Sequence, residues 1–282
     1  MIFEKHGLLA EILDPESKAL SEYQVEKTAD DTIQCWVPST EGNNFKIRWK
    51  IVKLLHPGHD LRTDPFLDGV QMRGAATYKR LLVEGYSYQH YEQPIGTTTA
   101  RLYEFGKRTL TDSNDYAKPD ESIIKNLNTI KLKFTWGNTG KLVPYVCSAP
   151  QEIELIHEKA AKKGHSGAAK LGKTITIPTP ASVDFAPDKA IKPITFVFNY
   201  APEDWLRARD IIPGGPETIS QDNQGILKRE RSTTPEIIDI DDLETDDDEI
   251  QIIKHMIPAP APNNKRQRVE RRDEARPKKE EE

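Results

Sequence analysis

The sequence contains few of the residues that cross-link a small protein or anchor it in a membrane. Cys35 and Cys147 are its two cysteines, and no run of Cys or His has the spacing of a zinc site, which argues against a disulfide framework and a structural metal. A reducing compartment fits this usage best. The first residues lack a basic stretch followed by a long apolar run, so neither a secretory signal nor a membrane span is predicted.

Aromatic residues are missing from the end of the chain, because every Phe, Tyr and Trp lies at or before Trp205. From Gly214 onward there are 12 Lys and Arg against 18 Asp and Glu, a balance of −6 within a total of −5, which leaves the first 213 residues near +1. Such a segment buries too little apolar surface to offset the entropy of ordering. We therefore predict a folded domain over residues 1–213 and a disordered, charged tail over residues 214–282.

Short apolar runs bounded by turn residues recur through the first half of the chain. They predict a mainly β domain built from antiparallel strands rather than a wound α/β fold. Asp68-Gly69, between apolar residues, predicts a tight hairpin because both residues tolerate the positive φ of the turn. The expected strands cover residues 8–13, 23–27, 32–37, 45–55, 80–91, 100–110, 128–137, 141–147, 173–180 and 194–200.

The pattern predicts one or two short helices. Apolar residues at helical spacing, lysines in the last turn and a stop at Gly164 predict a helix within residues 150–164. Residues 201–212 carry acids early and arginines late, which predicts a second, short helix.

Several separated motifs resemble a known family. They are "IQCWVPSTEGNNF", "LDGVQMRG", "YEFGKRTLTD", "NTIKLKFTW", "IHEKAAKKGHS" with "KLG", and "PITFVFNYAPEDWLRARDIIP". In this order, over about residues 8–213, they are similar to an uncharacterised fungal, mainly basidiomycete, domain of unknown function. The resemblance implies a mostly β, sandwich-like domain with no established activity and no catalytic residues to carry over.

The stretch "GAAKLGKT", residues 167–174, matches the spacing of a phosphate-binding loop. Such a loop needs a strand before it and a helix after it, because the helix N-terminus and successive backbone N–H groups hold the phosphates. Here a predicted helix precedes the match and a proline-containing, β-branched stretch follows it. We predict a turn in which Gly164, Gly167 and Gly172 bend the chain, and no nucleotide site.

No enzyme chemistry is apparent in the folded part. His56 and His59 with Asp60 and Asp64 form a weak cluster on a proline-glycine loop, which favours a polar loop over a metal site. No Ser, Cys or Lys nucleophile has a recognisable local signature. We therefore expect a protein that is not an enzyme and carries no cofactor.

The tail contains an aliphatic trio beside an acidic run. Eight of the eleven residues from Asp239 to Glu249 are acidic, and isoleucines are otherwise disfavoured in such a run. The pattern resembles a SUMO-interacting motif, which adds a strand to a sheet edge and directs its acids to basic residues of the partner. The residues predicted to bind are Ile237, Ile238, Ile240, Asp241 and Asp242, with a second trio at Ile250, Ile252 and Ile253. The alternative is a solvating acidic tract with incidental isoleucines.

Other short motifs predict modification and transport. Lys228 in "LKRE" fits the pattern for SUMO attachment, and Thr234 and Thr245 fit phosphorylation patterns. Basic clusters resemble a bipartite nuclear localisation signal, although interspersed acids also fit a solubility tail and argue against direct nucleic-acid binding. Their residues are Lys265, Arg266, Arg268, Arg271, Arg272, Lys278 and Lys279.

The resulting hypothesis is a non-enzymatic binding or scaffold protein of the nucleus, or of nucleus and cytoplasm. Its predicted partners are SUMO or a SUMO-modified protein and an import receptor, and no membrane partner is predicted. Two alternatives remain open. One is an enzyme whose pocket is assembled from residues distant in sequence. The other is a purely structural β domain with an inert tail.

Overall fold

The computed structural model describes residues 1–111, 121–147, 156–157 and 165–213. All of them lie in the first of two compact units, Met1–Ser220 and Gln221–Glu282. The tail predicted over residues 214–282 therefore lies outside the described residues. Within the described part, no helix has the length and apolar character needed to cross a membrane.

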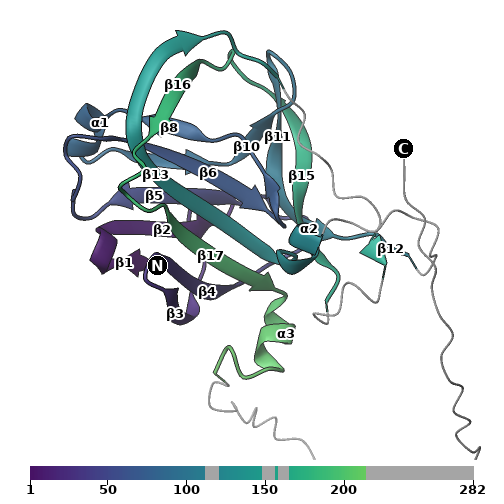
Figure 1. Cartoon of the computed structure of the whole chain (residues 1–282). Helices are drawn as coiled ribbons and strands as arrows, with labels where there is room; N and C mark the ends of the chain where they lie inside the picture. The colour runs from purple at the N-terminus through teal and green to yellow at the C-terminus, as the bar shows by residue number, and fades with distance from the viewer. Residues whose placement is uncertain (112–120, 148–155, 158–164, 214–282) are drawn as a thin grey trace, which may run out of the picture. The chain divides into compact units, whose positions relative to one another are not determined.

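The largest sheet contains most of the long strands (Figure 1). Its central strand pairs are antiparallel, except that β17 runs parallel to β4, with Phe196 opposite Ile33. The sheet is therefore mixed. Its order is β3 (Tyr23–Ala29), β4 (Thr32–Pro38), β17 (Ile194–Ala201), β13 (Thr129–Val143), β6 (Asp60–Leu67) and β7 (Val70–Gln71), with β16 (Ser182–Pro187) paired to β13 and β8 (Ala75–Thr77) paired to β6.

Three smaller sheets complete the unit. The first is β1 (Ile2–Phe3), β2 (Leu8–Leu13), β5 (Lys46–Ile51) and β9 (Ser87–His90). The second is β10 (Glu92–Pro94), β11 (Thr99–Lys107) and β15 (Gly167–Thr176). The third pairs β12 (Leu110–Thr111) with β14 (Ile156–His157) in parallel.

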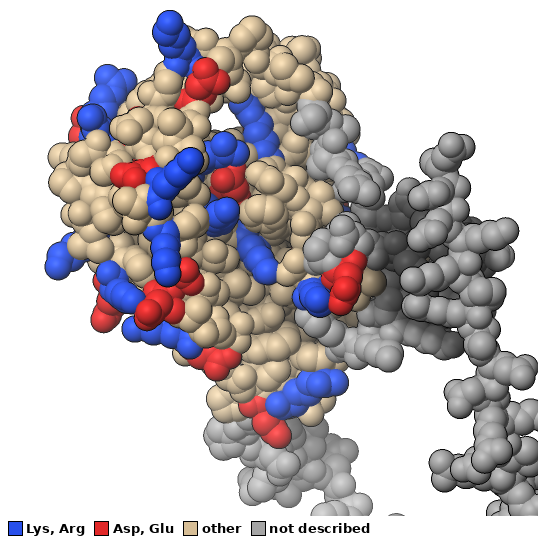
Figure 2. Space-filling view, in the orientation of Figure 1, with Lys and Arg blue, Asp and Glu red and all other residues tan. Residues whose placement is uncertain are grey.

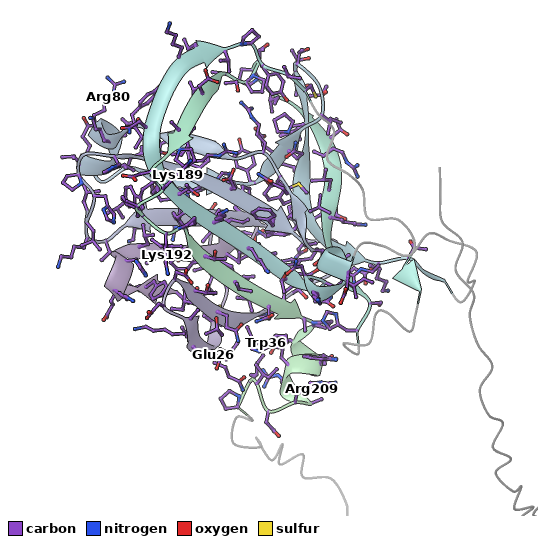
Figure 3. All side chains as sticks on the ribbon, viewed as in Figure 1. Glu26, Trp36, Arg80, Lys189, Lys192 and Arg209 are labelled. Atoms are coloured by element: carbon purple, nitrogen blue, oxygen red, sulfur yellow. The ribbon has the colours of Figure 1, made fainter. Side chains whose placement is uncertain are left out.

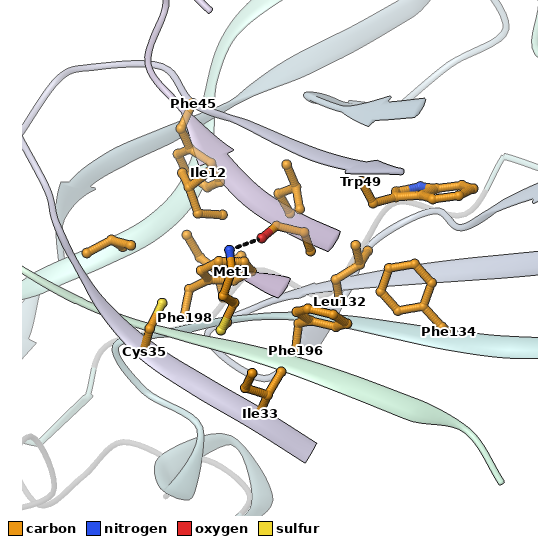
Figure 4. Packing of buried hydrophobic residues seen from close by; sticks show 14 of the residues in the cluster. Met1, Ile12, Ile33, Cys35, Phe45, Trp49, Leu132, Phe134, Phe196 and Phe198 are labelled. Carbon is orange, nitrogen blue, oxygen red and sulfur yellow. Dashed lines mark hydrogen bonds between the residues drawn. The ribbon is translucent and has the colours of Figure 1, made fainter. Parts of the chain in front are cut away.

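One hydrophobic core joins the largest sheet to the β1–β2–β5–β9 and β10–β11–β15 sheets, and alternate residues along their strands point into it. Trp49 of β5 meets Phe134 of β13 edge to face with ring centroids 5.6 Å apart, and Phe134 lies 5.3 Å from Phe196 of β17 (Figure 4). Phe3 of β1 also contacts Phe196, at 6.1 Å. Rings at these separations bury large apolar areas and add about 0.5–1.5 kcal/mol per pair. The mainly β prediction is confirmed, and sheets packed across a shared core give it a sandwich-like character.

The predicted hairpin is confirmed. Leu67 pairs with Val70, so Asp68 and Gly69 form a two-residue loop, with φ of +49° and +88°. Both angles fit the tight turn that matches the twist of the flanking strands.

Helices in the described residues are short. α1 (Lys79–Val83), α2 (Glu121–Lys125) and α3 (Glu203–Arg207) each have one turn or little more, and a 3₁₀ turn covers Glu4–His6. The helix predicted over residues 201–212 is confirmed as α3, which is shorter than expected. The strand predicted over residues 80–91 is wrong in its first half, where α1 lies.

Two further predictions, a helix over residues 150–164 and a strand over residues 141–147, are corrected by the observed strands. Ile156–His157 forms β14 rather than part of a helix, and the rest of the predicted helix over 150–164 lies outside the described residues. The strand expected over residues 141–147 is wrong, because residues 141–143 continue β13 and no strand covers 144–147.

Candidate functional site

The binding, modification and import residues predicted in the tail all lie outside the described residues. This holds for the isoleucine and aspartate positions between 237 and 253, for Lys228, Thr234 and Thr245, and for the basic positions between 265 and 279. Their roles stay predictions.

The stretch that resembles a phosphate loop is a strand. Residues 167–174 belong to β15, which pairs antiparallel with β11 from Lys107↔Gly167 to Thr99↔Thr176. The expectation that Gly167 and Gly172 supply turns is therefore wrong. Lys170 lies 3.4 Å from Glu104 of the neighbouring strand, and Lys173 is exposed. Paired extended backbone does not have the curved array of N–H groups on which such a loop depends.

The histidine-aspartate loop is divided among separate partners. His59 contacts Asp188 at 3.0 Å, and the carboxylate of Asp60 accepts from the backbone N–H groups of Lys79 and Thr139, each at 2.8 Å. Asp64 is paired with Arg62 at 2.9 Å. Across the described ranges, no group of three or more His, Cys, Asp or Glu side chains has a metal-binding arrangement.

Asp68, in the predicted hairpin turn, is the centre of a fully buried hydrogen-bond network. Its carboxylate accepts from Arg108 at 2.5 Å, from the Tyr200 hydroxyl at 2.7 Å, and from the backbone N–H groups of Thr129 and Ala169, both at 3.2 Å. We call these five residues the Asp68 node. It links the β6–β7 turn to β13, β15, β17 and the residue that follows β11.

Burial and hydrogen bonding shift the pKa of Asp68 in opposite directions. Burial raises the pKa of Asp68, while Arg108, Tyr200 and the N–H group of Ala169 act to lower it. The Tyr200 pKa is also raised, by burial and then by the neighbouring carboxylate, so this phenol keeps its proton and donates. Because donors surround the carboxylate, the node is suited to joining strands rather than to exchanging protons.

A second group of titratable side chains lies where β9, β10 and β11 meet. We call Tyr88, Tyr91, Glu92, Tyr103 and Arg73 the tyrosine cluster. The backbone N–H of Tyr103 donates to the carbonyl of Tyr91 at 2.9 Å, and Glu92 is paired with Leu102, the neighbour of Tyr103. The charges of Tyr88 and Glu92 help to raise the pKa of Tyr103, and Arg73 acts to lower the pKa of Tyr88 and of Glu92. Arg73 is anchored by its backbone N–H, which donates to Gln93 Oε1 at 2.6 Å, and its guanidinium lies 4.8 Å from the ring of Tyr145.

The tyrosine cluster contains buried polar atoms that the described protein does not satisfy. The hydroxyl of Tyr103, a residue with 0% exposure, and the Oε2 atom of Glu92 have no hydrogen-bond partner among the described residues. Glu92 does share a side-chain hydrogen bond with Tyr91. Burial raises the pKa of Glu92, of Tyr88 and, most strongly, of Tyr103. Native proteins satisfy most buried polar groups, so these two atoms make the cluster a candidate site, although six other buried side-chain atoms among the described residues also lack a partner.

His90 borders the tyrosine cluster from β9. Its ring lies 4.8 Å from that of Tyr88, and its Nε2 is hydrogen-bonded to Thr63 Oγ1 at 2.8 Å. Burial lowers the pKa of His90 to about 3, so the imidazole is neutral at physiological pH. The cluster therefore offers neutral donors and acceptors, with Arg73 and Glu92 as its charged or chargeable members.

A comparison with family models places the chain. Residues 14–214 match the model described as Domain of unknown function (DUF7918). The chain belongs to this family. No curated protein and no solved structure matches it.

The DUF7918 domain is structurally continuous with the thirteen residues that precede the match. Phe3, Leu8, Ala10 and Ile12 all have 0% exposure and belong to the same core as Trp49 and Phe196. The folded unit therefore includes residues before the family boundary.

Sequence reasoning missed both candidate sites inside the DUF7918 domain. The hairpin signal located Asp68, but nothing local showed that Arg108 and Tyr200 would meet it. A weak signal existed for the tyrosine cluster, because five of the nine tyrosines, Tyr78, Tyr86, Tyr88, Tyr91 and Tyr103, lie within residues 78–103.

An open groove of about 470 Å³ lies elsewhere, between the β1–β2 edge and β3. Its lining is mostly apolar, and its two carboxylates already have partners. Glu11 contacts Arg48 at 2.8 Å, and Glu22 contacts the amino group of Met1. The groove therefore offers apolar surface without a free charged group among its lining residues in the described structure.

Proposed function

We propose that this protein is a non-enzymatic nuclear binding or scaffold protein, in which the DUF7918 domain is a binding module and the tail carries import and SUMO-linked regulation. A fungal, mainly basidiomycete, range for the family is part of this proposal. The observation that carries it is the trio Ile237, Ile238 and Ile240 next to a run in which eight of eleven residues are acidic.

The physical case for SUMO rests on two complementary contributions. An extended segment that adds a strand to a sheet edge gains backbone hydrogen bonds, and its aliphatic side chains fill a groove. Flanking acids accelerate the encounter with a basic rim. A phosphate on Thr245 adds about 1.5 to 2 negative charges to the same segment and strengthens that attraction.

The test measures binding of the full chain to SUMO by fluorescence anisotropy. Replacing Ile237, Ile238 and Ile240 together by alanine should weaken binding about tenfold or more, because three buried aliphatic contacts are lost. A matched control replaces Ile226, Leu227 and Ile257, aliphatic residues outside the acidic run, and should leave affinity unchanged. Equal affinity of the two variants would contradict the SUMO proposal.

Import is tested separately in cells. Replacing Lys265, Arg266 and Arg268 by glutamine should shift a fluorescent fusion of the full chain from nucleus to cytoplasm. Replacing Lys50, Lys53 and Lys173, three exposed lysines of the folded domain, by glutamine is the matched control. A nuclear fraction unaffected by the tail substitutions would favour the inert-tail alternative.

The chemistry of the buried groups supports a non-enzymatic role. Burial raises the pKa of Cys35 to about 12, which keeps the sulfur as an unreactive thiol. The phenols of Tyr103 and Tyr200 remain protonated, and His90 remains neutral. General acid–base catalysis works best with groups whose pKa lies near the operating pH.

One observation favours the enzyme alternative. Glu92 has a raised pKa and a buried oxygen without a partner in the described residues, which are features of a general acid. If Glu92 is catalytic, the full chain incubated with a mixture of small metabolites should consume one of them, and Glu92→Gln should abolish that consumption. No consumption by the wild-type chain would count against this alternative.

A further inference from the structure

Two buried oxygen atoms of the tyrosine cluster lack a hydrogen-bond partner among the described residues, and their chemistry is complementary. The hydroxyl of Tyr103 can donate and accept, whereas the Oε2 atom of Glu92 accepts when the carboxyl group is ionised. The charge of Glu92 helps to raise the pKa of Tyr103, which indicates that the two groups lie within electrostatic reach of each other. One hydroxyl group of a ligand can therefore accept from Tyr103 and donate to Glu92.

The tyrosine cluster adjoins an opening in the molecular surface. In Figure 1, β13 and its partner β16 form an arch, and Figure 2, in the same orientation, shows an opening beneath this arch. The guanidinium of Arg73 donates to the carbonyl of Ala181, next to β16, and lies 4.8 Å from the ring of Tyr145, just beyond β13. Its backbone N–H donates to Gln93 Oε1 at 2.6 Å. Arg73 therefore connects the end of the arch to β10, the strand that carries Glu92.

Tyrosine rings in and beside the cluster range from exposed to buried. Tyr86 and Tyr91 are 42% and 38% exposed, Tyr88 is half-buried, and Tyr103 is fully buried. The ring centroids of Tyr86 and Tyr88 lie 6.4 Å apart. Small-molecule sites commonly combine aromatic surface with a few polar groups that fix the orientation of the ligand. The cluster has both components.

A second group of aromatic residues, at α3, offers less free ring surface. Trp36 and Trp205 are half-buried, and their ring centroids lie 5.7 Å apart. The guanidinium of Arg209 lies 4.1 Å from the ring of Trp205. Figure 3 shows Trp36 and Arg209 at the end of the molecule opposite to the arch. These rings are therefore already covered by one another and by a cation of the same helix region.

The charges of the tyrosine cluster favour a neutral ligand. Arg73 is its one basic residue and Glu92 its one carboxylate, and Arg73 acts to lower the pKa of Glu92. A cationic ligand would meet the guanidinium that already lies against Tyr145, and an anionic ligand would meet Glu92. Hydroxyl groups can bind between these two side chains without bringing a third charge into a partly buried place.

We propose that the tyrosine cluster binds a neutral sugar unit, which enters beneath the arch of β13 and β16. One hydroxyl group of the sugar accepts from Tyr103 and donates to Oε2 of Glu92, and the C–H face of the sugar ring packs on Tyr88 and Tyr91. Arg73 lies beside the sugar at the opening. This inference goes beyond the proposed function, because neither SUMO binding nor nuclear import requires such a site.

The test measures binding of glucose, galactose, mannose and N-acetylglucosamine to the folded full chain by isothermal titration calorimetry. At least one of these sugars should bind the wild type with a Kd of about 1 mM, because a ligand of this size makes few contacts. Tyr103→Phe should weaken that affinity about fivefold or more through the loss of one hydrogen bond. Glu92→Gln should weaken it as well, because the amide lacks the negative charge that strengthens the bond.

Tyr200→Phe is the matched control, since it removes another buried tyrosine hydroxyl, at the Asp68 node, and should leave the sugar affinity unchanged. The proposal is overturned if none of the four sugars binds the wild type, if Tyr103→Phe binds as tightly as the wild type, or if both phenylalanine variants lose affinity equally. Tighter binding of tetramethylammonium or inorganic phosphate that depends on Tyr103 overturns it in favour of a charged ligand. SUMO affinity should be the same in Tyr103→Phe and the wild type, which separates this result from the tail proposal.

Discussion

The Asp68 node and the tyrosine cluster both place a carboxylate and a phenol in buried surroundings, yet their hydrogen bonding differs. Asp68 receives four donors, one of them the hydroxyl of Tyr200. The hydroxyl of Tyr103 and the Oε2 atom of Glu92 have no hydrogen-bond partner among the described residues. The Asp68 carboxylate is hydrogen-bonded on both oxygens, although Nη1 of Arg108 in the same node has no partner among the described residues. In the tyrosine cluster the phenol and the carboxylate oxygen themselves have no partner, which is costly unless something else supplies the bonds. This difference in hydrogen bonding makes Asp68 a structural joint between strands and the tyrosine cluster a candidate binding site.

Substituting Asp68 should lower the stability of the fold more than any other change considered below. Asp68→Ala leaves the Arg108 guanidinium, 4% exposed, without its counter-charge and frees three other donors, so the free energy of unfolding should fall by about 3–5 kcal/mol. Denaturant titration measures this fall in the free energy of unfolding. Asp68→Asn keeps the shape of the side chain and provides a folded variant if the alanine form does not fold.

A surface carboxylate provides the control for that result. Asp188→Ala removes an ion pair with His59 in which both side chains are about one-third exposed, and should change stability much less than Asp68→Ala does. If Asp68→Ala cost no more than this control, the node would not be the joint that its geometry indicates.

Acidification should destabilise the region of the tyrosine cluster through His90. Its pKa is about 3 in the folded protein and its ordinary value is 6.5, so between these limits the unfolded chain binds more protons. Stability is therefore complete above pH 6.5 and falls as the pH is lowered toward 3. At pH 5, 1.5 units below 6.5, the loss is about 2 kcal/mol at about 1.4 kcal/mol per unit.

The pH dependence itself tests the assignment to His90. His90→Gln should flatten the slope of unfolding free energy between pH 5 and 7, whatever its effect on absolute stability. An unchanged slope in His90→Gln would assign the acid sensitivity to other groups.

Two matched phenol deletions compare the sites directly. Tyr200→Phe removes a donor to Asp68 and should cost about 1–3 kcal/mol, since it leaves a buried acceptor less satisfied. Tyr103→Phe removes a buried hydroxyl without a described partner and should leave stability unchanged or raise it, because an unsatisfied polar group is lost. Equal costs in thermal or denaturant unfolding would show that Tyr103 has a bound partner in solution.

The smallest change in stability is expected for substitutions in β15, the strand whose sequence resembles a phosphate loop. Lys173 is exposed on β15, so Lys173→Ala should change stability by less than about 0.5 kcal/mol. ATP should not shift the melting temperature of the wild type. A shift lost in Lys173→Ala would mean that the paired strand rearranges to bind nucleotide.

Much of the fold could be predicted from local pattern. The alternating residues of β2, β4, β5 and β17 determine which faces are buried, because side chains in a strand point to opposite sides in turn. Residues 167–174 were harder to predict, because their glycines suggest turns. They form a strand because they pair with β11, as Ala168 does with Gly106.

The candidate sites depended on contacts that no local pattern contains. Tyr200 and Asp68 are 132 residues apart in the chain, and Ala169 and Asp68 are 101 apart, yet all meet in one node. The sequence by itself determined the β class, the hairpin at Asp68-Gly69, and the charged, aromatic-free composition of residues 214–282. Only the tertiary structure decided which buried polar groups have hydrogen-bond partners. The physical reason is that burial and hydrogen bonding depend on which strands lie side by side.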